Sequence, residues 1–134
     1  MAALAISVAG DTHLMARADA ELLREVFLNL LINAGQAMEG RGEVRVTIAG
    51  GAMATVRIRD AGPGMPDDLQ DRVFEPFFTT KRTGTGLGLA IVRRLLELQG
   101  GAVSIEATSS EGTTMLVVLP PESAGSRPKS PRPA

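Results

Sequence analysis

Three polar residues in one strongly apolar segment could take part in ligand chemistry: Glu25, Asn29 and Asn33. They recur every four positions, so on an α-helix all three side chains would project from one stripe. Asparagine offers a neutral amide oxygen of the kind that Mg²⁺ accepts beside water and phosphate oxygens. The same spacing also fits the solvated edge of an ordinary amphipathic helix, so it is not specific by itself.

A carboxylate followed by two glycines is the second candidate, in the segment DAGPG at residues 60–64. Asp60 follows a predicted strand, and Gly62 and Gly64 would let the backbone turn sharply and approach a flat ligand. A pocket with Asp60 at its floor is one interpretation. An ordinary turn is the other, because Asp, Gly and Pro are common turn residues.

The glycine-rich segment GTGLGL, residues 84–89, leads into a predicted helix. It lacks the lysine of a Walker A loop and the spacing of a dinucleotide-binding fold, so neither of those sites is supported. Backbone N–H groups at a helix N-terminus bind anions, so this helix start is predicted to hold phosphate groups. Lys81, just upstream, is a further phosphate contact or else a solvated charge. The candidate contacts at the helix start are Thr85, Gly86, Leu87 and Gly88.

Together with EGTT at residues 111–114, these segments closely resemble in order and spacing the N, G1, G2 and G3 boxes of an ATP-binding superfamily. That superfamily includes histidine kinases, type II topoisomerases, mismatch-repair ATPases and the large heat-shock chaperones. The N box would be FLNLLINAGQAM at residues 27–38, and FEPFFTTK at residues 74–81 resembles the F box of histidine kinases specifically. The resemblance covers essentially residues 3–120 and implies that family's fold, often named after Bergerat.

The resemblance implies that the chain binds ATP with Mg²⁺. Asn33 falls where the family has its metal ligand, and Asp60 falls where a carboxylate accepts a hydrogen bond from the adenine amino group. Such a carboxylate would face the carbonyl oxygen of guanine with no donor between them, which disfavours GTP. Thr113 matches a threonine that helps to orient the aspartate. Further nucleotide contacts are implied for Asn29, Gly62 and Gly64.

The long segment between the second and third boxes resembles the family's ATP lid, which would span residues 62–85. In the family, the F box anchors this lid and meets the helices that carry the phosphoacceptor histidine. Aromatic residues clustered in a polar loop also usually pin that loop to the core, which is the expectation for Phe74, Phe77 and Phe78.

One departure from the hydrolysing relatives bears on the reaction. In those relatives a glutamate one helical turn before the metal-binding asparagine orients the attacking water, and the matching residue here is Asn29. An amide cannot accept the proton, so phosphotransfer is favoured over hydrolysis. The only histidine, His13, lacks the surrounding pattern of an acceptor helix. The implied acceptor is a histidine on a separate dimerisation domain, with a response regulator as the indirect partner.

Two other functions remain open at this point. A serine-kinase anti-sigma factor of the same superfamily shares the asparagine and aspartate boxes, but it usually lacks both an F box like residues 74–81 and the full GTGLGL segment. A nucleotide-sensing module would bind ATP without transferring phosphate. Transfer to a supplied histidine hairpin distinguishes that module from a kinase.

Periodicity along the chain predicts the elements that must position these residues. Helical spacing of apolar residues and a capping Asp19 predict a helix over 20–39. Alternating residues predict a hairpin with a polar face that carries Arg45, Arg57 and Arg59. The expected strands are 4–8, 43–48, 54–59, 103–107 and 114–119, with a second helix over 87–99 and a loop over 61–85 that has one helical turn near 67–71. This order predicts an α/β (α+β) two-layer sandwich, in which helices cover one face of a mixed, mostly antiparallel sheet.

Composition limits the class of protein. The chain has 134 residues, a net charge of -1 and 44% apolar residues, which suits one small domain, and it has no basic excess that would favour nucleic acid. We expect an ATP-binding catalytic domain over 1–120 and a proline-rich, disordered tail over 121–134. The chain has no cysteine, and its start resembles neither a signal peptide nor a membrane span, so we expect a cytoplasmic location and no membrane contact.

Overall fold

The structure, a computed structural model, describes residues 4–11, 13–16, 18–78 and 88–121. Each predicted strand and helix is present, with ends that differ from the prediction by no more than two residues. In chain order the elements are β1 (Leu4–Gly10), α1 (Ala20–Ala37), β2 (Gly42–Ala49), β3 (Ala54–Arg59), α2 (Asp67–Gln70), α3 (Gly88–Glu97), β4 (Ala102–Ser109) and β5 (Gly112–Leu119).

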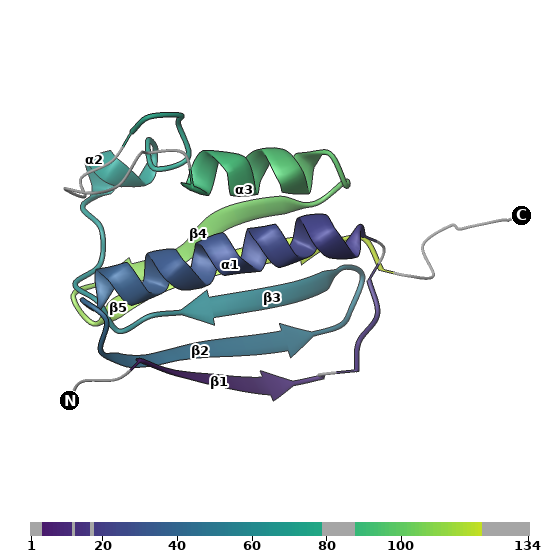
Figure 1. Ribbon diagram of the computed structural model, residues 1–134, viewed down its shortest axis with the longest axis horizontal. Coiled ribbons are helices and arrows are strands. Elements are labelled where there is room, and N and C mark those ends of the chain that lie inside the picture. The colour runs from purple at the N-terminus through teal and green to yellow at the C-terminus, as the bar shows by residue number, and fades with distance from the viewer. Residues whose placement is uncertain (1–3, 12, 17, 79–87, 122–134) are drawn as a thin grey trace, which may run out of the picture.

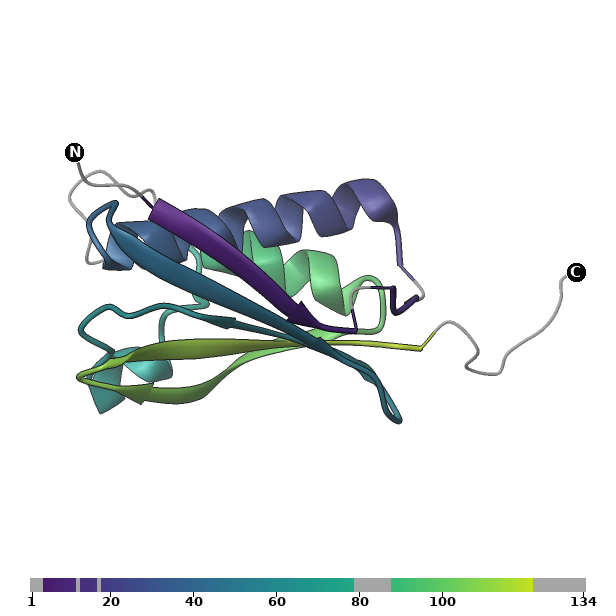
Figure 2. The ribbon, with the colours of Figure 1, turned by 90° about the horizontal axis from the view of Figure 1, so that it is seen from below.

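The five strands form one mixed sheet in the order β1-β2-β3-β5-β4 (Figure 1). β1 runs parallel to β2, and the other neighbouring pairs are antiparallel. α1 and α3 lie together on one face of the sheet (Figure 2). The predicted two-layer fold class is therefore confirmed.

The core fills the space between the sheet and the two long helices. Alternate residues of a strand point to opposite faces, and on the helix side β3 buries Val56 and Ile58 while β5 buries Val117. From α1, Val26 and Leu30 are 0% and 1% exposed. The other buried apolar residues are Ala34, Met38, Val44, Ala54, Phe74, Val92, Leu96, Met115 and Leu119. Burial of these side chains is the main stabilising term of the domain.

Capping hydrogen bonds satisfy backbone groups at both ends of α1. The Asp19 carboxylate accepts from two backbone N–H groups of the first turn, at 2.9 and 3.1 Å, which confirms Asp19 as the N-cap. The helix ends at Ala37 rather than at Glu39, because Glu39 takes a left-handed φ of 56°. The Gly40 N–H then donates to the Gly35 carbonyl oxygen at 2.8 Å and satisfies one of the last helical carbonyls.

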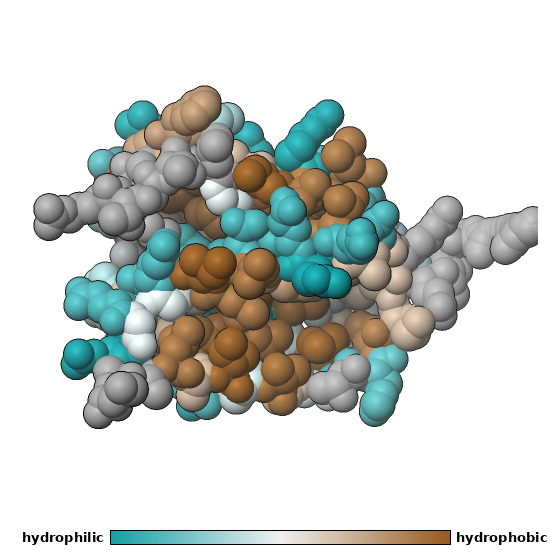
Figure 3. All heavy atoms as spheres, viewed as in Figure 1, coloured by the Kyte–Doolittle hydropathy of each residue, from teal (hydrophilic) through white to brown (hydrophobic). Residues whose placement is uncertain are grey.

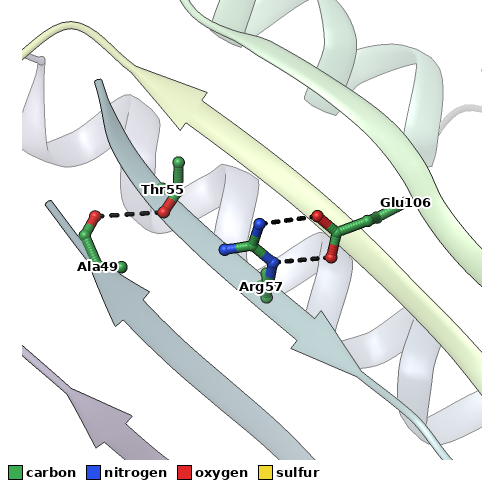
Figure 4. A network of polar contacts seen from close by, with 4 residues as sticks. All are labelled: Ala49, Thr55, Arg57 and Glu106. Atoms are coloured by element: carbon green, nitrogen blue, oxygen red, sulfur yellow. Dashed lines mark hydrogen bonds and ion pairs between the residues drawn. The ribbon is translucent and has the colours of Figure 1, made fainter. Parts of the chain in front are cut away.

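The sheet face away from the helices carries charged residues, as predicted. The Arg57 guanidinium forms two hydrogen bonds with the Glu106 carboxylate, at 2.7 and 2.8 Å, and so links β3 with β4 across β5 (Figure 4). Glu106 is the extra residue at a bulge, where the pairing of β4 with β5 shifts register. The hydrogen bond from Arg57 lowers the pKa of Glu106. Arg45 pairs with Glu43 at 3.0 Å, and Arg59 lies opposite Arg45 in the register.

From the end of β3 to residue 78 the chain is largely irregular, as predicted, and the helical turn within this described part is α2. Residues 79–87 lie outside the described residues, as do residues 122–134 of the tail predicted over 121–134. Pro121 makes an isolated antiparallel bridge with Ala16. This bridge holds the end of β5 beside the segment that leads into α1.

Burial predicts a sharp contrast between two leucines of α1. Leu30 is 1% exposed and Leu28 is 54% exposed. We expect Leu30→Ala to lower the free energy of unfolding by about 2–5 kcal/mol, because it leaves a cavity in the core, and Leu28→Ala to lower it by less than about 1 kcal/mol. Urea unfolding followed by circular dichroism measures both values. Equal losses would contradict the way α1 packs against the sheet.

Candidate nucleotide-binding site

The polar stripe of α1 faces the start of α3. The Asn29 side-chain amide donates from Nδ2 to the backbone oxygen of Glu25 at 2.9 Å, which fixes its orientation along the helix. A β carbon added to Gly88, the first residue of α3, would lie 3.3 Å from Asn29 Oδ1. Asn33 lies one turn further along the stripe and is half-buried. The helix therefore sets Asn29 beside Gly88, which belongs to the segment that is predicted to hold phosphate.

Asp60 is the only buried carboxylate among the described residues, at 6% exposed. Its Oδ1 accepts hydrogen bonds from the backbone N–H groups of Gly62 at 2.8 Å and Thr113 at 3.2 Å. Within the described part of the chain, both hydrogen bonds to this carboxylate end on Oδ1. A buried carboxylate oxygen normally has a partner, so Oδ2 is the atom that could accept a donor from a ligand.

The glycines after Asp60 are required by packing within the protein. A β carbon added to Gly62 would lie 2.8 Å from the Ala37 carbonyl oxygen at the end of α1. Gly64 has a φ of 84°, and its β carbon would collide with the Ser109 carbonyl oxygen at the end of β4. The sequence predicts that both glycines let a ligand approach, but this account is incomplete. Each glycine also lets the backbone pass close to another part of the protein, the end of α1 for Gly62 and the end of β4 for Gly64.

Sequence reasoning misses Thr108, which joins the aspartate segment to the β4–β5 hairpin. Its hydroxyl accepts a hydrogen bond from the Met65 backbone N–H at 2.9 Å and lies 2.8 Å from the Thr113 hydroxyl. Thr108 and Thr113 are directly opposed in the strand register. In the sequence they lie directly beside the ends of the two predicted strands, 103–107 and 114–119, so the predicted hairpin indicates that they can meet. Thr113 contacts Asp60 through its backbone N–H, while its hydroxyl pairs with Thr108.

Met38, the C-cap residue of α1, supports the same segment from the helix layer. Its Sδ accepts a hydrogen bond from the Ala61 backbone N–H at 3.2 Å, directly after Asp60. Met38 is 7% exposed. In the sequence it simply continues the apolar stripe of the helix, so no local signal separates it from other core residues.

The three phenylalanines of the loop lie in different environments. Phe74 is 9% exposed and packs in the core. The Arg72 guanidinium lies over the Phe78 ring, with Cζ 4.6 Å from the ring centroid. Phe77 is 75% exposed and has a left-handed φ of 66°. The expectation that all three pin the loop to the core is therefore wrong for Phe77.

The structure assembles the predicted site residues in two groups. The first lies where β3 ends and β5 begins, and comprises Asp60, Gly62, Gly64 and Thr113. The second comprises Asn29 of α1 and Gly88 at the start of α3, with Asn33 one turn further along α1. The other predicted phosphate contacts fall outside the described residues: Lys81, Thr85, Gly86 and Leu87.

Comparison with known proteins identifies a single family. Residues 18–123 match the family described as histidine kinase-, DNA gyrase B-, and HSP90-like ATPase. The signal transduction histidine-protein kinase AtoS of Escherichia coli K12 is 41% identical over 105 residues, which are 77% of this chain and 17% of that kinase. The sensor histidine kinase ZraS of the same organism is 40% identical over 113 residues, which are 84% of this chain and 24% of that kinase. The chain thus spans less than a quarter of either kinase.

Solved structures give the same result in three dimensions. The catalytic domain of histidine kinase ThkA, in a nucleotide-free form, has a TM-score of 0.78 at 31% identity, and the match covers 88% of this chain and 79% of that chain. Full-length ShkA in complex with AMPPNP has a TM-score of 0.73 at 33% identity, and the match covers 87% of this chain and 25% of that chain. The chain belongs to the family of histidine kinase-, DNA gyrase B- and HSP90-like ATPases, and within it to the catalytic domains of sensor histidine kinases.

Proposed function

We propose that this domain binds Mg-ATP and donates the γ-phosphate to a histidine on a separate dimerisation domain of the same sensor kinase. The observation that carries the proposal is the buried carboxylate of Asp60, which two backbone N–H groups hold through Oδ1. Membership in a family of kinases and ATPases supports ATP as the ligand. The chain spans less than a quarter of AtoS and of ZraS, which is consistent with an acceptor elsewhere in the full-length protein.

The fixed carboxylate suits adenine better than guanine. The adenine amino group can donate a hydrogen bond to Oδ2 of Asp60, whereas guanine carries a carbonyl oxygen at that position. Because Gly62 and Thr113 hold Oδ1, the carboxylate cannot turn away from a guanine without breaking two hydrogen bonds. A guanine oxygen facing an acceptor would leave both groups without a hydrogen bond. The contact therefore favours adenine and also disfavours guanine.

The side chains near the proposed phosphate site fit Mg²⁺ carried in with the nucleotide. Among the described residues, no group of three or more histidine, cysteine, aspartate or glutamate side chains could hold a metal ion. Mg²⁺ usually takes few protein ligands and keeps water and phosphate oxygens, so the amide oxygen of Asn33 is a sufficient protein ligand. When bound, the ion supplies positive charge that offsets the negative charge of the phosphoryl oxygens.

Transfer is favoured over hydrolysis because α1 offers no base beside the phosphates. Asn29 presents an amide toward Gly88, and an amide cannot take a proton from water. Glu25 lies eight residues before Asn33, which is about 12 Å along the helix axis. The only histidine, His13, is exposed in the turn before α1. The nucleophile is therefore a histidine of another domain.

Within the described residues, no helix is long and apolar enough to cross a membrane. We place the domain in the cytoplasm, where ATP is available. A response regulator would then receive the phosphoryl group from the acceptor histidine.

Removal of the Asp60 carboxylate tests the adenine contact. Asp60→Ala should weaken ADP and ATP binding by about tenfold to a hundredfold, since a hydrogen bond to a charged group contributes about 1.5–3 kcal/mol. Titration calorimetry measures the change. Glu97→Ala, which removes an exposed carboxylate at the end of α3, is the matched control and should bind like the parent. Parent-like binding by a folded Asp60→Ala, or equal competition by GTP, would rule out the adenine role.

Asn33→Ala tests the metal ligand. We expect this change to weaken Mg²⁺-dependent ATP binding by about tenfold or more and to leave metal-free ADP binding nearly unchanged, because the amide would contact the ion and not the base. A fluorescent nucleotide titrated with and without EDTA measures both values. Gln36→Ala removes an exposed amide from the same helix and should have no effect on either. If magnesium dependence survives in Asn33→Ala, the role of Asn33 is structural.

Phosphate transfer is tested with a supplied acceptor. Alone, the chain should hydrolyse almost no ATP and should not label itself from γ-labelled ATP, because it lacks both the base and the acceptor. A histidine-bearing helical hairpin from the same kinase should become labelled, and the label should be acid-labile. Asn29→Ala should slow labelling more than it weakens nucleotide binding.

Each other outcome of the transfer experiment points to a different function. Robust hydrolysis by the chain alone would indicate an ATPase. Acid-stable labelling of a serine in an added protein would indicate a serine kinase of the anti-sigma type. Tight ATP binding with no labelling of the hairpin would indicate a nucleotide-sensing module.

A further inference from the structure

Two threonine hydroxyls meet close to Asp60, in the hairpin that joins β4 to β5. The Oγ1 atoms of Thr108 and Thr113 lie 2.8 Å apart, and either one could be the donor. The backbone N–H of Thr113 donates to Oδ1 of Asp60 at 3.2 Å. The direction of the hydrogen bond between the hydroxyls therefore decides whether Thr113 offers a proton or a lone pair beside Asp60.

Asp60 lies at a polar end of the molecule. Ala61 and Gly62, which follow it, lie against Met38 and Ala37 at the end of α1. Figure 3 shows hydrophilic residues gathered at this end of the helix side, at left, whereas apolar residues gather between α1 and the β1 edge. A base bound at this end meets polar groups, so hydrogen bonds can distinguish one base from another.

The surroundings of the two hydroxyls differ in a way that fixes the donor. Thr108 Oγ1 accepts from the Met65 backbone N–H at 2.9 Å, and a hydroxyl has one proton and two lone pairs. Thr108 is half-buried, so its proton can reach solvent, whereas Thr113 is 4% exposed. If Thr108 donated, the Thr113 proton would stay buried. Among the described residues, the Thr113 hydroxyl has no hydrogen-bond partner except Thr108.

Only one arrangement leaves no buried proton without an acceptor: Thr113 donates and Thr108 accepts. A buried donor without a partner costs free energy, and buried polar groups are normally paired. Thr108 then accepts two hydrogen bonds, one from Met65 and one from Thr113. With its proton held in this way, the Thr113 hydroxyl can offer a ligand only lone pairs.

We propose that Thr108 is a positioning residue that sets base specificity, because it holds the proton of Thr113 and so makes the adenine end of the site a pair of acceptors. Oδ2 of Asp60 and Oγ1 of Thr113 together favour the amino group at position 6 of adenine over the carbonyl oxygen of a 6-oxopurine. This inference rests on the proposed function, in that it takes Asp60 as the contact to adenine. Thr108 acts through Thr113 and does not need to touch the base.

A purely structural role of Thr108 has a different consequence. Thr108 also supports the backbone after Asp60, through the Met65 N–H and through Gly64, where a β carbon would lie 3.1 Å from Thr108 Oγ1. Loss of this support alone would weaken the binding of every purine nucleotide alike. Loss of the proton acceptor would instead change the relative affinity for 6-amino and 6-oxo purines, because Thr113 would be free to donate.

The test measures the dissociation constants of ADP and IDP, whose bases carry an amino group and a carbonyl oxygen at position 6. Displacement of a fluorescent nucleotide gives both constants, and their ratio cancels any loss common to the two. Thr108→Val keeps the shape of the side chain and removes its hydroxyl. Its preference for ADP over IDP should fall about two- to tenfold, the effect of one hydrogen bond. Thr108→Ser keeps a hydroxyl and should restore the preference of the parent.

A matched control and a double variant locate the effect. The Thr55 hydroxyl donates to the Ala49 carbonyl oxygen at 3.2 Å, at the other end of β3. Thr55→Val therefore removes a comparable hydrogen bond away from Asp60 and should keep the parent ratio. Thr113→Val removes the group on which Thr108 acts, so adding Thr108→Val to it should not lower the ratio further. Thr108→Ala is a second variant without the hydroxyl, and circular dichroism checks that each variant is folded.

Three outcomes would overturn the inference. The preference for ADP could be unchanged or higher in the folded Thr108→Val and Thr108→Ala. It could fall as far in Thr55→Val or Thr108→Ser as in Thr108→Val. It could also fall further when Thr108→Val is added to Thr113→Val. The parent protein separates this inference from the proposed function: equal binding of ADP and IDP by the parent would overturn both, whereas a parent that prefers ADP together with unchanged Thr108 variants would overturn this inference alone.

Discussion

One carboxylate oxygen, Oδ1 of Asp60, determines how the end of β3 meets the start of β5. Two backbone N–H groups converge on it, from Gly62 at 2.8 Å and from Thr113 at 3.2 Å. The convergence requires close backbone approaches, and a β carbon on Gly112 would collide with the Asp60 carbonyl oxygen. The glycine positions, the turn after β3 and the direction of Oδ2 all follow from this arrangement. The same acid therefore organises the polypeptide, and in the proposed function its Oδ2 accepts the adenine amino group.

The two halves of the site depend on different layers of the fold. The aspartate half is built from strand ends and is held by the Thr108–Thr113 pair across the β4–β5 hairpin. The asparagine half depends on the packing of α1 against α3, whose inner faces bury Leu30 and Leu96 in the common core. Met38 connects the halves, because it belongs to α1 and accepts a hydrogen bond from Ala61. Loosening the core would therefore disturb both halves together.

Much of the fold could be predicted because its signals are local. The 3.6-residue spacing in α1, the capping Asp19 and the alternation in β3 each reflect one element buried on one face. The contacts that sequence reasoning misses join residues distant in the chain. The sulfur of Met38 meets the Ala61 N–H 23 positions later, and no periodicity encodes that meeting. The clustering of aromatic residues in a polar loop predicts that Phe77 packs in the core, but Phe77 is 75% exposed and has a left-handed φ of 66°.

The contact of Asn29 with the start of α3 constrains how such a domain can change through evolution. A lineage that moved toward free hydrolysis would need a carboxylate at position 29. Asn29 Oδ1 lies 3.3 Å from where a β carbon on residue 88 would stand, and that space is open only because residue 88 is glycine. A glutamate at position 29, one methylene longer than asparagine, could extend into this space. A larger residue at position 88 would close it, so the two positions can change only together.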